Sequence, residues 1–142
     1  MRLKIGDQTR LERTILEEDL EAFAKMSLDR NRIHFDNEFA KQSYFGKPIA
    51  HGMIGAALIS GALTKLMGDG NLWLDAKIKF QRPIFVGDIL QITLSVQEIN
   101  HRGVITIDVS ICNKNDEIVI LGEVKSMQIA RQVKEDVGEV SL

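Results

Sequence analysis

A long apolar segment followed by a run of alternating residues constrains the fold of this chain most. Residues 52–66 are apolar around nearly the whole helical circumference and contain several small side chains. A helix that is apolar on all sides is a buried helix. After residue 70 the apolar period changes to two, which is typical of antiparallel strands with one wet face. The sequence therefore predicts a long buried helix covered by an antiparallel sheet, an α+β arrangement.

The strands are expected where apolar and polar residues alternate. The pattern predicts strands over 75–80, 90–96, 105–111 and 118–129. In the last of these the alternation slips at Gly122, which indicates a β-bulge. A further strand or extended arm is expected over 9–16. The exposed edges of such a curled sheet invite pairing with a second copy of the chain, so we expect a homodimer or a higher homo-oligomer.

Two shorter helices are expected before the long one. Residues 17–26 combine an acidic first turn, which the helix dipole favours, with an apolar stripe at helical spacing. Residues 27–34 break that period and are expected to form a loop. A short helix capped by Asp36 or Asn37 is expected over 37–43.

Size and composition favour one soluble domain. The chain has 142 residues, of which 44% are apolar and 27% charged, and single domains commonly contain about 100–150 residues. We expect a single domain over 1–142, with the charged residues 134–142 as a flexible tail.

The net charge and the length of the apolar segments limit the kinds of partner that we expect. The net charge of -2 gives no basic excess of the kind that nucleic-acid-binding domains show. The longest apolar run, residues 53–63, is shorter than the roughly 20 residues that cross a bilayer. The N-terminus lacks the apolar core of a signal peptide, and the single Cys112 cannot form an intrachain disulfide. We therefore expect a cytoplasmic protein with no nucleic-acid partner and no membrane partner.

One polar block beside the long helix contains the residues best suited to proton transfer. Asp29 and His34 lie five residues apart, and residues 45–53 then read F-G-K-P-I-A-H-G-M. Histidine suits proton transfer near neutral pH. Gly52 opens the long helix, where N–H groups without helical partners attract negative charge. A carboxylate, an imidazole and a helix N-terminus can together hold a water, move a proton and stabilise an oxyanion.

These two blocks resemble the MaoC-like dehydratases, the (R)-specific enoyl-CoA hydratases, which have the hot-dog fold. The family pattern is S-G-D-x-N-P-[IL]-H followed by F-G-x-P-[IV]-[AV]-H-G-M. The matching residues here are Ser27, Asp29, Asn31, Ile33, His34, Phe45, Gly46, Pro48, Ile49, Ala50, His51, Gly52 and Met53. The likeness extends over about residues 8–130. It implies a curled antiparallel sheet wrapped around a long buried central helix.

The resemblance also implies an activity, the reversible hydration of a trans-2-enoyl thioester to an (R)-3-hydroxyacyl thioester. The acyl group would be carried on CoA or on acyl carrier protein. A water would be activated between Asp29 and His34, with the thioester oxygen stabilised at the N–H of Gly52. Which of the two side chains is base and which is acid stays open. The substrate-binding residues are expected to be Asn31, Met53, Ser60 and Leu63, with no metal and no other cofactor.

Two departures from the family pattern keep other functions open. Leu28 stands where the family has glycine, which suits backbone conformations that leucine tolerates poorly. Arg32 replaces the family's proline and could pair with Asp29, lowering its basicity. One alternative is a hot-dog acyl-CoA thioesterase, and another is a non-catalytic module that binds acyl thioesters.

His51 allows two interpretations, a structural hydrogen-bonding residue or a wall of the site, and we expect the structural one. A zinc site built from Asp29, His34 and His51 does not fit the usual ligand spacing.

Overall fold

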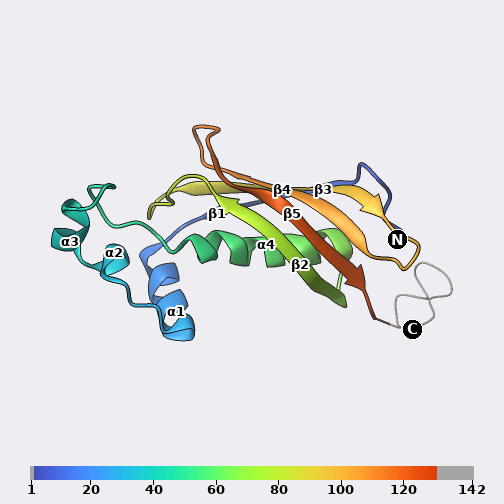
Figure 1. Ribbon diagram of the computed structural model, residues 1–142, viewed down its shortest axis with the longest axis horizontal. Coiled ribbons are helices and arrows are strands. Elements are labelled where there is room, and N and C mark those ends of the chain that lie inside the picture. The colour runs from blue at the N-terminus through green and yellow to red at the C-terminus, as the bar shows by residue number, and fades with distance from the viewer. Residues whose placement is uncertain (1, 131–142) are drawn as a thin grey trace.

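The protein contains one five-stranded antiparallel sheet that lies over one long helix (Figure 1). The structure is a computed structural model, which describes residues 2–130. The strand order across the sheet is β1-β3-β4-β5-β2. The strands are β1 (Gln8–Thr14), β2 (Asn71–Phe80), β3 (Ile89–Ile99), β4 (Ile105–Cys112) and β5 (Ile118–Gln128). The α+β class and the hot-dog arrangement that the sequence predicted are confirmed.

The long helix runs along one face of the sheet, and the short helices gather beyond its first turn (Figure 1). The helices are α1 (Glu17–Ser27), α2 (Arg32–Phe35), α3 (Asn37–Lys41) and α4 (Gly52–Met67). The predicted start of the long helix at residue 52 is therefore confirmed. The end of the molecule where α4 begins is also where α1, α2 and α3 bring the polar block of the sequence.

The core lies between α4 and the inward faces of the strands. Ile59 and Leu63 of α4 are fully buried there. They pack in one cluster with the fully buried strand residues Leu90, Ile92, Leu94, Ile107 and Ile111. These strand residues alternate with polar ones, so the period of two places every apolar side chain on the same face.

The prediction that α4 is buried on all sides is wrong for the single chain. The sheet covers only one side of the helix, and Met53, Ala57, Ser60 and Thr64 are exposed along the other side. The edge strand β2 lies beside this stripe and exposes Leu72, Leu74 and Phe80. An apolar pattern shows that a helix face avoids water, but it does not show which chain covers that face.

The loop predicted over 27–34 ends earlier than expected, because α2 begins at Arg32. The Asn31 side chain caps this helix by accepting the N–H of Ile33 at 3.1 Å. Asp36 caps α3 through the N–H of Phe39 at 3.0 Å, as the sequence predicted. The two caps place two short helices in a row. The sequence predicted the second helix but not the first, because four residues show no periodic pattern.

The predicted bulge at Gly122 is wrong. Gly122 pairs in regular register with Ile78 of β2 and Val109 of β4. A Cβ on Gly122 would lie 2.8 Å from the Cα of Ile78 and against the carbonyl oxygen of Lys77. Glycine stands here because the neighbouring strand approaches closely. The register of β5 shifts earlier in the strand, where Ile118 and Ile120 pair with Cys112 and Ile111.

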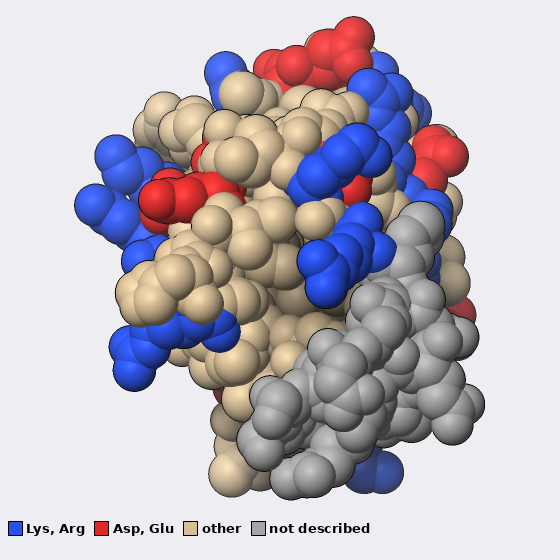
Figure 2. Space-filling view, turned by 90° about the vertical axis from the view of Figure 1, so that its right-hand side faces the viewer, with Lys and Arg blue, Asp and Glu red and all other residues tan. Residues whose placement is uncertain are grey.

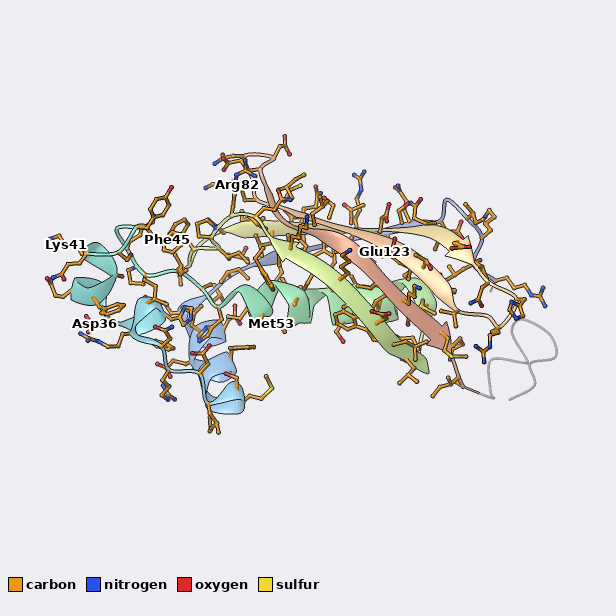
Figure 3. All side chains as sticks on the ribbon, viewed as in Figure 1. Asp36, Lys41, Phe45, Met53, Arg82 and Glu123 are labelled. Carbon is orange, nitrogen blue, oxygen red and sulfur yellow. The ribbon has the colours of Figure 1, made fainter. Side chains whose placement is uncertain are left out.

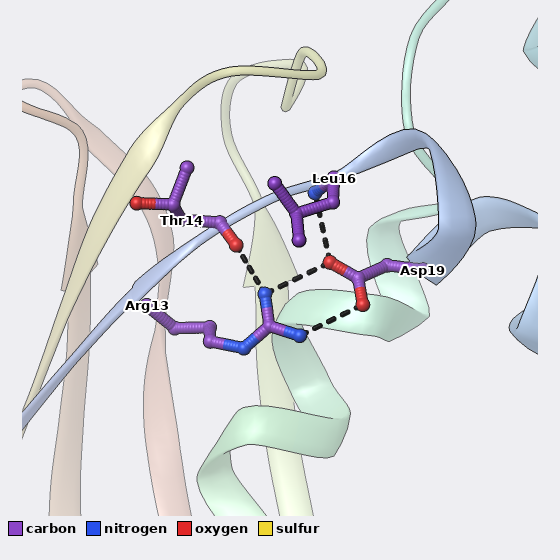
Figure 4. Close-up of polar contacts among 4 residues, drawn as sticks. All are labelled: Arg13, Thr14, Leu16 and Asp19. Atoms are coloured by element: carbon purple, nitrogen blue, oxygen red, sulfur yellow. Dashed lines mark hydrogen bonds and ion pairs between the residues drawn. The ribbon is translucent and has the colours of Figure 1, made fainter.

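The start of α1 is fixed to β1 by a bidentate ion pair (Figure 4). Two guanidinium nitrogens of Arg13 lie 2.9 and 2.8 Å from the two carboxylate oxygens of Asp19. Asp19 also accepts the N–H of Leu16 at 2.8 Å, and Arg13 donates to the carbonyl oxygen of Thr14. Arg13 and this N–H both hold the pKa of the Asp19 carboxyl below its usual value, Arg13 being the larger cause.

The surface has charges of both signs side by side. Figure 2 shows Lys and Arg side chains interspersed with Asp and Glu over the described part of one end of the molecule. Within residues 2–130, no helix is long and apolar enough to cross a membrane. The predicted tail, residues 134–142, lies outside the described residues, and a single domain over 1–142 stays a prediction.

Candidate active site

Asp29 lies in a tight turn directly after α1. Leu28 ends that helix in the left-handed conformation, with φ 68° and ψ 11°, and its N–H donates to the carbonyl oxygen of Ala24 at 2.8 Å. Beyond it, the N–H of Asp29 donates to Ser27 Oγ, and the N–H of Asn31 donates to a carboxylate oxygen of Asp29, both at 3.1 Å. The turn therefore orients an otherwise exposed carboxylate.

His34 lies on α2, and its ring is fixed by the segment that leads into α4. Its Nδ1 lies 2.8 Å from the carbonyl oxygen of Ile49. A carbonyl oxygen only accepts, so Nδ1 carries the proton of this hydrogen bond. In the neutral ring, Nε2 of His34 then has a free lone pair and can accept a proton.

His51 lies immediately before α4 and contacts both of these residues. Its side chain is buried, with 3% of the residue exposed. Its Nε2 lies 3.0 Å from the main-chain carbonyl oxygen of Asp29. Its ring stacks on that of His34, with centroids 3.7 Å apart and planes 27° from parallel. Phe23 packs on the same ring at 4.7 Å between centroids.

The pKa of His51 is lowered from its ordinary value, and burial is the largest cause. The hydrogen bond to the carbonyl oxygen of Asp29 acts in the opposite direction, and charge on His34 lowers the pKa further. Among residues 2–130, Nδ1 of His51 has no hydrogen-bond partner. The neutral ring with its proton on Nε2 therefore fits this environment.

The turn, α2 and the residue before α4 together bring three side chains into one cluster. A carboxylate oxygen of Asp29 and one ring nitrogen each of His34 and His51 all lie within 4.8 Å of one another. Two hydrogen bonds of about 2.8 Å that meet at a water near the tetrahedral angle span roughly 4.6 Å. The spacing between the carboxylate and the imidazole thus suits one bridging water.

The same three residues are a poor set of ligands for a metal ion. Ring nitrogens bind a metal through lone pairs that lie in the ring plane, and the planes of His34 and His51 are nearly parallel. Lone pairs that lie in stacked planes do not converge readily on one ion.

Gly52 lies next to this cluster, at the N-terminus of α4. No acceptor for its N–H is found among residues 2–130, as expected for the first residue of a helix. Gly52 lines a mainly apolar pocket of about 410 Å³ together with Met53, Phe45 and Phe80. A Cβ on Gly52 would lie 2.8 Å from the Phe80 ring, so packing also requires glycine here. Figure 3 shows Phe45, Met53 and Arg82 around this end of α4.

A second pocket, of about 420 Å³, opens beside His34. It is lined by residues of α1 and by Phe35, Lys47 and Pro48. The segment 47–50 separates the two pockets, since Lys47 and Pro48 line one and Ile49 and Ala50 the other. His34 therefore borders the second pocket, and Gly52 borders the first.

The remaining expected substrate-binding residues are spread along the structure. The Asn31 side chain is engaged in the cap of α2, while its N–H orients Asp29. Ser60 lies on the exposed stripe of α4, about 12 Å beyond Gly52 at 1.5 Å per residue. Leu63 is fully buried in the core. Of the four, Met53 is the one that lines the pocket at Gly52.

The expected pairing of Arg32 with Asp29 is wrong. Arg32 donates to the carboxylate of Asp36, one turn further along, at 2.9 Å. Its guanidinium also lies 4.6 Å from the centroid of the Phe39 ring. On a helix, the residue four positions ahead lies on the same face. Asp36 has that position relative to Arg32, whereas Asp29 precedes the helix. The replacement of proline by arginine therefore leaves the Asp29 carboxylate without this ion pair.

Sequence reasoning missed the link that His51 makes between Asp29 and His34. The contact joins a side chain to a main-chain oxygen 22 residues away. The one signal was the position of His51 within the second matched block, directly before Gly52.

Comparisons with known proteins identify related sequences and structures. The model of the MaoC like domain family matches residues 4–117. An (R)-specific enoyl-CoA hydratase from Rhodospirillum rubrum is 33% identical over 130 residues, covering 91% of this chain and 90% of that protein. A 3-hydroxybutyryl-CoA dehydratase from Methylorubrum extorquens is 34% identical, covering 85% of this chain and 78% of that protein. The solved (R)-hydratase from A. caviae superposes with a TM-score of 0.85 at 31% identity, covering 89% of this chain and 98% of that one.

Proposed function

The chain belongs to the MaoC-like domain family, and from that membership we propose that it is a hydro-lyase acting on thioesters. The proposed reaction is the reversible addition of water to a trans-2-enoyl thioester, which gives the (R)-3-hydroxyacyl thioester. The observation that supports it most is the approach of the Asp29 carboxylate and the His34 imidazole to within 4.8 Å, a spacing that suits one bridging water. No metal or other cofactor is expected to take part, and that stays a prediction.

In the proposed mechanism, the water lies between Asp29 and His34. Nε2 of His34 is the proposed base, because the proton on Nδ1 is held by the carbonyl oxygen of Ile49. One O–H bond of the water breaks, its proton passes to Nε2, and the oxygen forms a bond to C3. Asp29 accepts a hydrogen bond from the other O–H and orients the water. In this mechanism one water held by both groups attacks from one side of the double bond, which gives addition to a single face.

The electron pair of the C2–C3 double bond moves towards the thioester and gives an enolate. We place the enolate oxygen at the N–H of Gly52, which the start of α4 leaves without a helical partner. The His34 imidazolium then delivers its proton to C2, and the ring returns to its neutral form. The product gains one water in total, and the enzyme is unchanged.

We further propose that the functional unit is a homodimer. The edge strand β2 has a free side beyond its pairing with β5, and edge strands pair readily with a second copy. The exposed Leu72, Leu74 and Phe80 lie on this strand, next to the exposed stripe of α4. A second copy of the chain would cover both the exposed residues of β2 and the exposed stripe of α4. Sedimentation equilibrium tests this proposal, and a monomer at micromolar concentration would contradict it.

Hydration of crotonyl-CoA, followed through the loss of enoyl thioester absorbance, tests the proposed activity. Asp29→Asn and His34→Ala are each expected to lower kcat by about 10²-fold or more. Matched controls are Asp69→Asn and His101→Ala, which change the same residue types in exposed turns and should keep wild-type rates. Wild-type rates in the Asp29 and His34 variants would contradict the mechanism.

The same assay separates the alternative activities. Release of free thiol from crotonyl-CoA would indicate a thioesterase, because hydration leaves the thioester bond intact. Binding of acyl-CoA without turnover would indicate a non-catalytic module. A series of enoyl-CoA substrates of increasing length, and the corresponding acyl carrier protein thioesters, would define the preferred substrate.

A further inference from the structure

We propose that His51 is a positioning residue for the hydration reaction, which fixes Asp29 and His34 relative to each other from behind the reacting face. This inference rests on the proposed function of the Asp29 and His34 pair. His51 has no part in proton transfer in the mechanism above. Its contacts nevertheless reach both reacting residues, in addition to the link through Asn31, which donates to Asp29 and accepts the N–H of His34.

The first contact fixes the turn that carries Asp29. Nε2–H of His51 donates to the main-chain carbonyl oxygen of Asp29 at 3.0 Å. The other hydrogen bonds of this turn join it to its neighbours in sequence, namely to Ala24 of α1 and to Ile33 and His34 of α2. None of these bonds reaches α4. The bond from His51 attaches the Asp29 backbone to the N-terminus of α4.

The second contact fixes the plane of the His34 ring. The rings of His34 and His51 stack at 3.7 Å between centroids. A hydrogen bond from Nδ1 to Ile49 leaves the His34 ring free to swing about that bond, and the stack removes this freedom. Phe23 and Phe35 pack on His51 at 4.7 and 5.7 Å between centroids. His51 is therefore itself held in place.

The third feature is the protonation state that these contacts require. Donation from Nε2 to a carbonyl oxygen leaves Nδ1 of the neutral ring as an acceptor, and this atom is buried without a partner among residues 2–130. A proton on Nδ1 would be buried without an acceptor and would face the His34 ring. A neutral His51 can thus stack on His34 while that residue takes up and releases a proton.

Steady-state kinetics of two His51 variants tests the proposal. His51→Phe keeps an aromatic ring for the stack but removes the donor to Asp29. His51→Gln keeps an amide N–H near the position of Nε2 but removes the ring. Because a displacement of about 1 Å can cost 10²-fold in rate, we expect His51→Phe to lower kcat by roughly 10- to 100-fold, with KM for crotonyl-CoA nearly unchanged. His51→Gln is expected to recover part of the lost kcat.

The split between kcat and KM separates positioning from a general loss of structure. Equal thermal unfolding of the two variants would show that their rates differ for a local reason. A wild-type kcat in His51→Phe would overturn the proposal, as would a raised KM at unchanged kcat. Failure of the proposed function is distinct, because the wild-type protein would then not hydrate crotonyl-CoA at all.

A measurement on the wild-type protein keeps the proposal testable if the variants do not fold. The ¹⁵N shifts of the imidazole rings distinguish the two neutral tautomers from the cation. We expect His51 in the neutral form with its proton on Nε2 throughout the pH range of activity. The opposite tautomer, or a His51 that gains charge within that range, would overturn the proposal.

Discussion

The rings of His34 and His51 stack face to face, with centroids 3.7 Å apart, yet their environments differ. His51 is buried beneath Phe23 at the start of α4, whereas His34 is half-buried and borders a pocket. Burial disfavours the charged form of an imidazole, and a charged neighbour disfavours it further. The two adjacent histidines therefore differ in environment, as the roles proposed for them require.

This difference predicts how stability changes with pH. Burial lowers the pKa of His51 below the value of about 6.5 that histidine has in an unfolded chain. Between the folded pKa and about pH 6.5, the unfolded state therefore binds more protons than the folded state, and the free energy of unfolding rises with pH. The contribution of His51 is fully present above about pH 6.5 and is lost as the pH falls towards the folded pKa. Urea unfolding at pH 5.5 and 7.5 should show this loss in the wild type.

A matched pair of variants assigns the effect to this residue. His51→Gln should show a smaller difference between the two pH values, because glutamine does not titrate. His101→Gln, in an exposed turn, should behave like the wild type. An equal pH dependence in His51→Gln and the wild type would contradict the prediction.

Leu28 is a position where the chain is expected to gain stability on substitution. It adopts φ 68° at the end of α1 and is 85% exposed, so the side chain makes little packing contact. The left-handed conformation costs a residue with a Cβ about 1–2 kcal/mol, and glycine avoids this cost. We expect Leu28→Gly to raise the free energy of unfolding by about 1 kcal/mol in urea titrations.

Leu28→Ala is the matched control, because alanine shortens the side chain but keeps the Cβ. It should give no comparable gain. The rate of crotonyl-CoA hydration should be retained in Leu28→Gly, since the backbone path to Asp29 is unchanged. A less stable Leu28→Gly variant would mean that the leucine side chain makes a contribution that exceeds the backbone strain.

The ion pair between Arg13 and Asp19 at the start of α1 predicts that its removal lowers stability. Asp19→Asn removes one of the two carboxylate oxygens that bind Arg13 and weakens the acceptor for the N–H of Leu16. Loss of a helix-start interaction costs about 1 kcal/mol, and the partial exposure of Arg13 limits the ionic part. We expect Asp19→Asn to lower the free energy of unfolding by about this amount, measured by denaturant titration. Glu18→Gln, in the same turn, should cost clearly less, and equal losses would contradict the role given to Asp19.

The sequence was a good guide to the fold and a partial guide to the site. The change of apolar period after residue 70 predicted the sheet. The resemblance of two sequence blocks to the MaoC-like family predicted the pair of Asp29 and His34, which the structure brings together. The helix α2 was missed because four residues hold about one turn and show no period. The His51 contact was missed because it ends on a main-chain oxygen, which every residue has. The exposed stripe of α4 was missed because an apolar pattern does not show which surface packs against it.

Gly52 allows two explanations that a pair of variants can separate. Its N–H is placed at the enolate oxygen in the proposed mechanism, but a Cβ here would also meet the Phe80 ring at 2.8 Å. Gly52→Ala is therefore expected to lower stability by about 1–3 kcal/mol through overpacking. It should also lower kcat by up to about 10²–10³-fold, because the new methyl group holds the thioester oxygen away from the N–H.

The double variant Gly52→Ala/Phe80→Leu removes the ring atoms that the new Cβ would meet. Its stability should return towards that of Phe80→Leu alone, since the close contact with the ring is gone. Its kcat should stay low, because the methyl group still lies in front of the Gly52 N–H. Recovery of kcat together with stability would show instead that glycine is required here only to fit against Phe80, and the enolate oxygen would then need another donor.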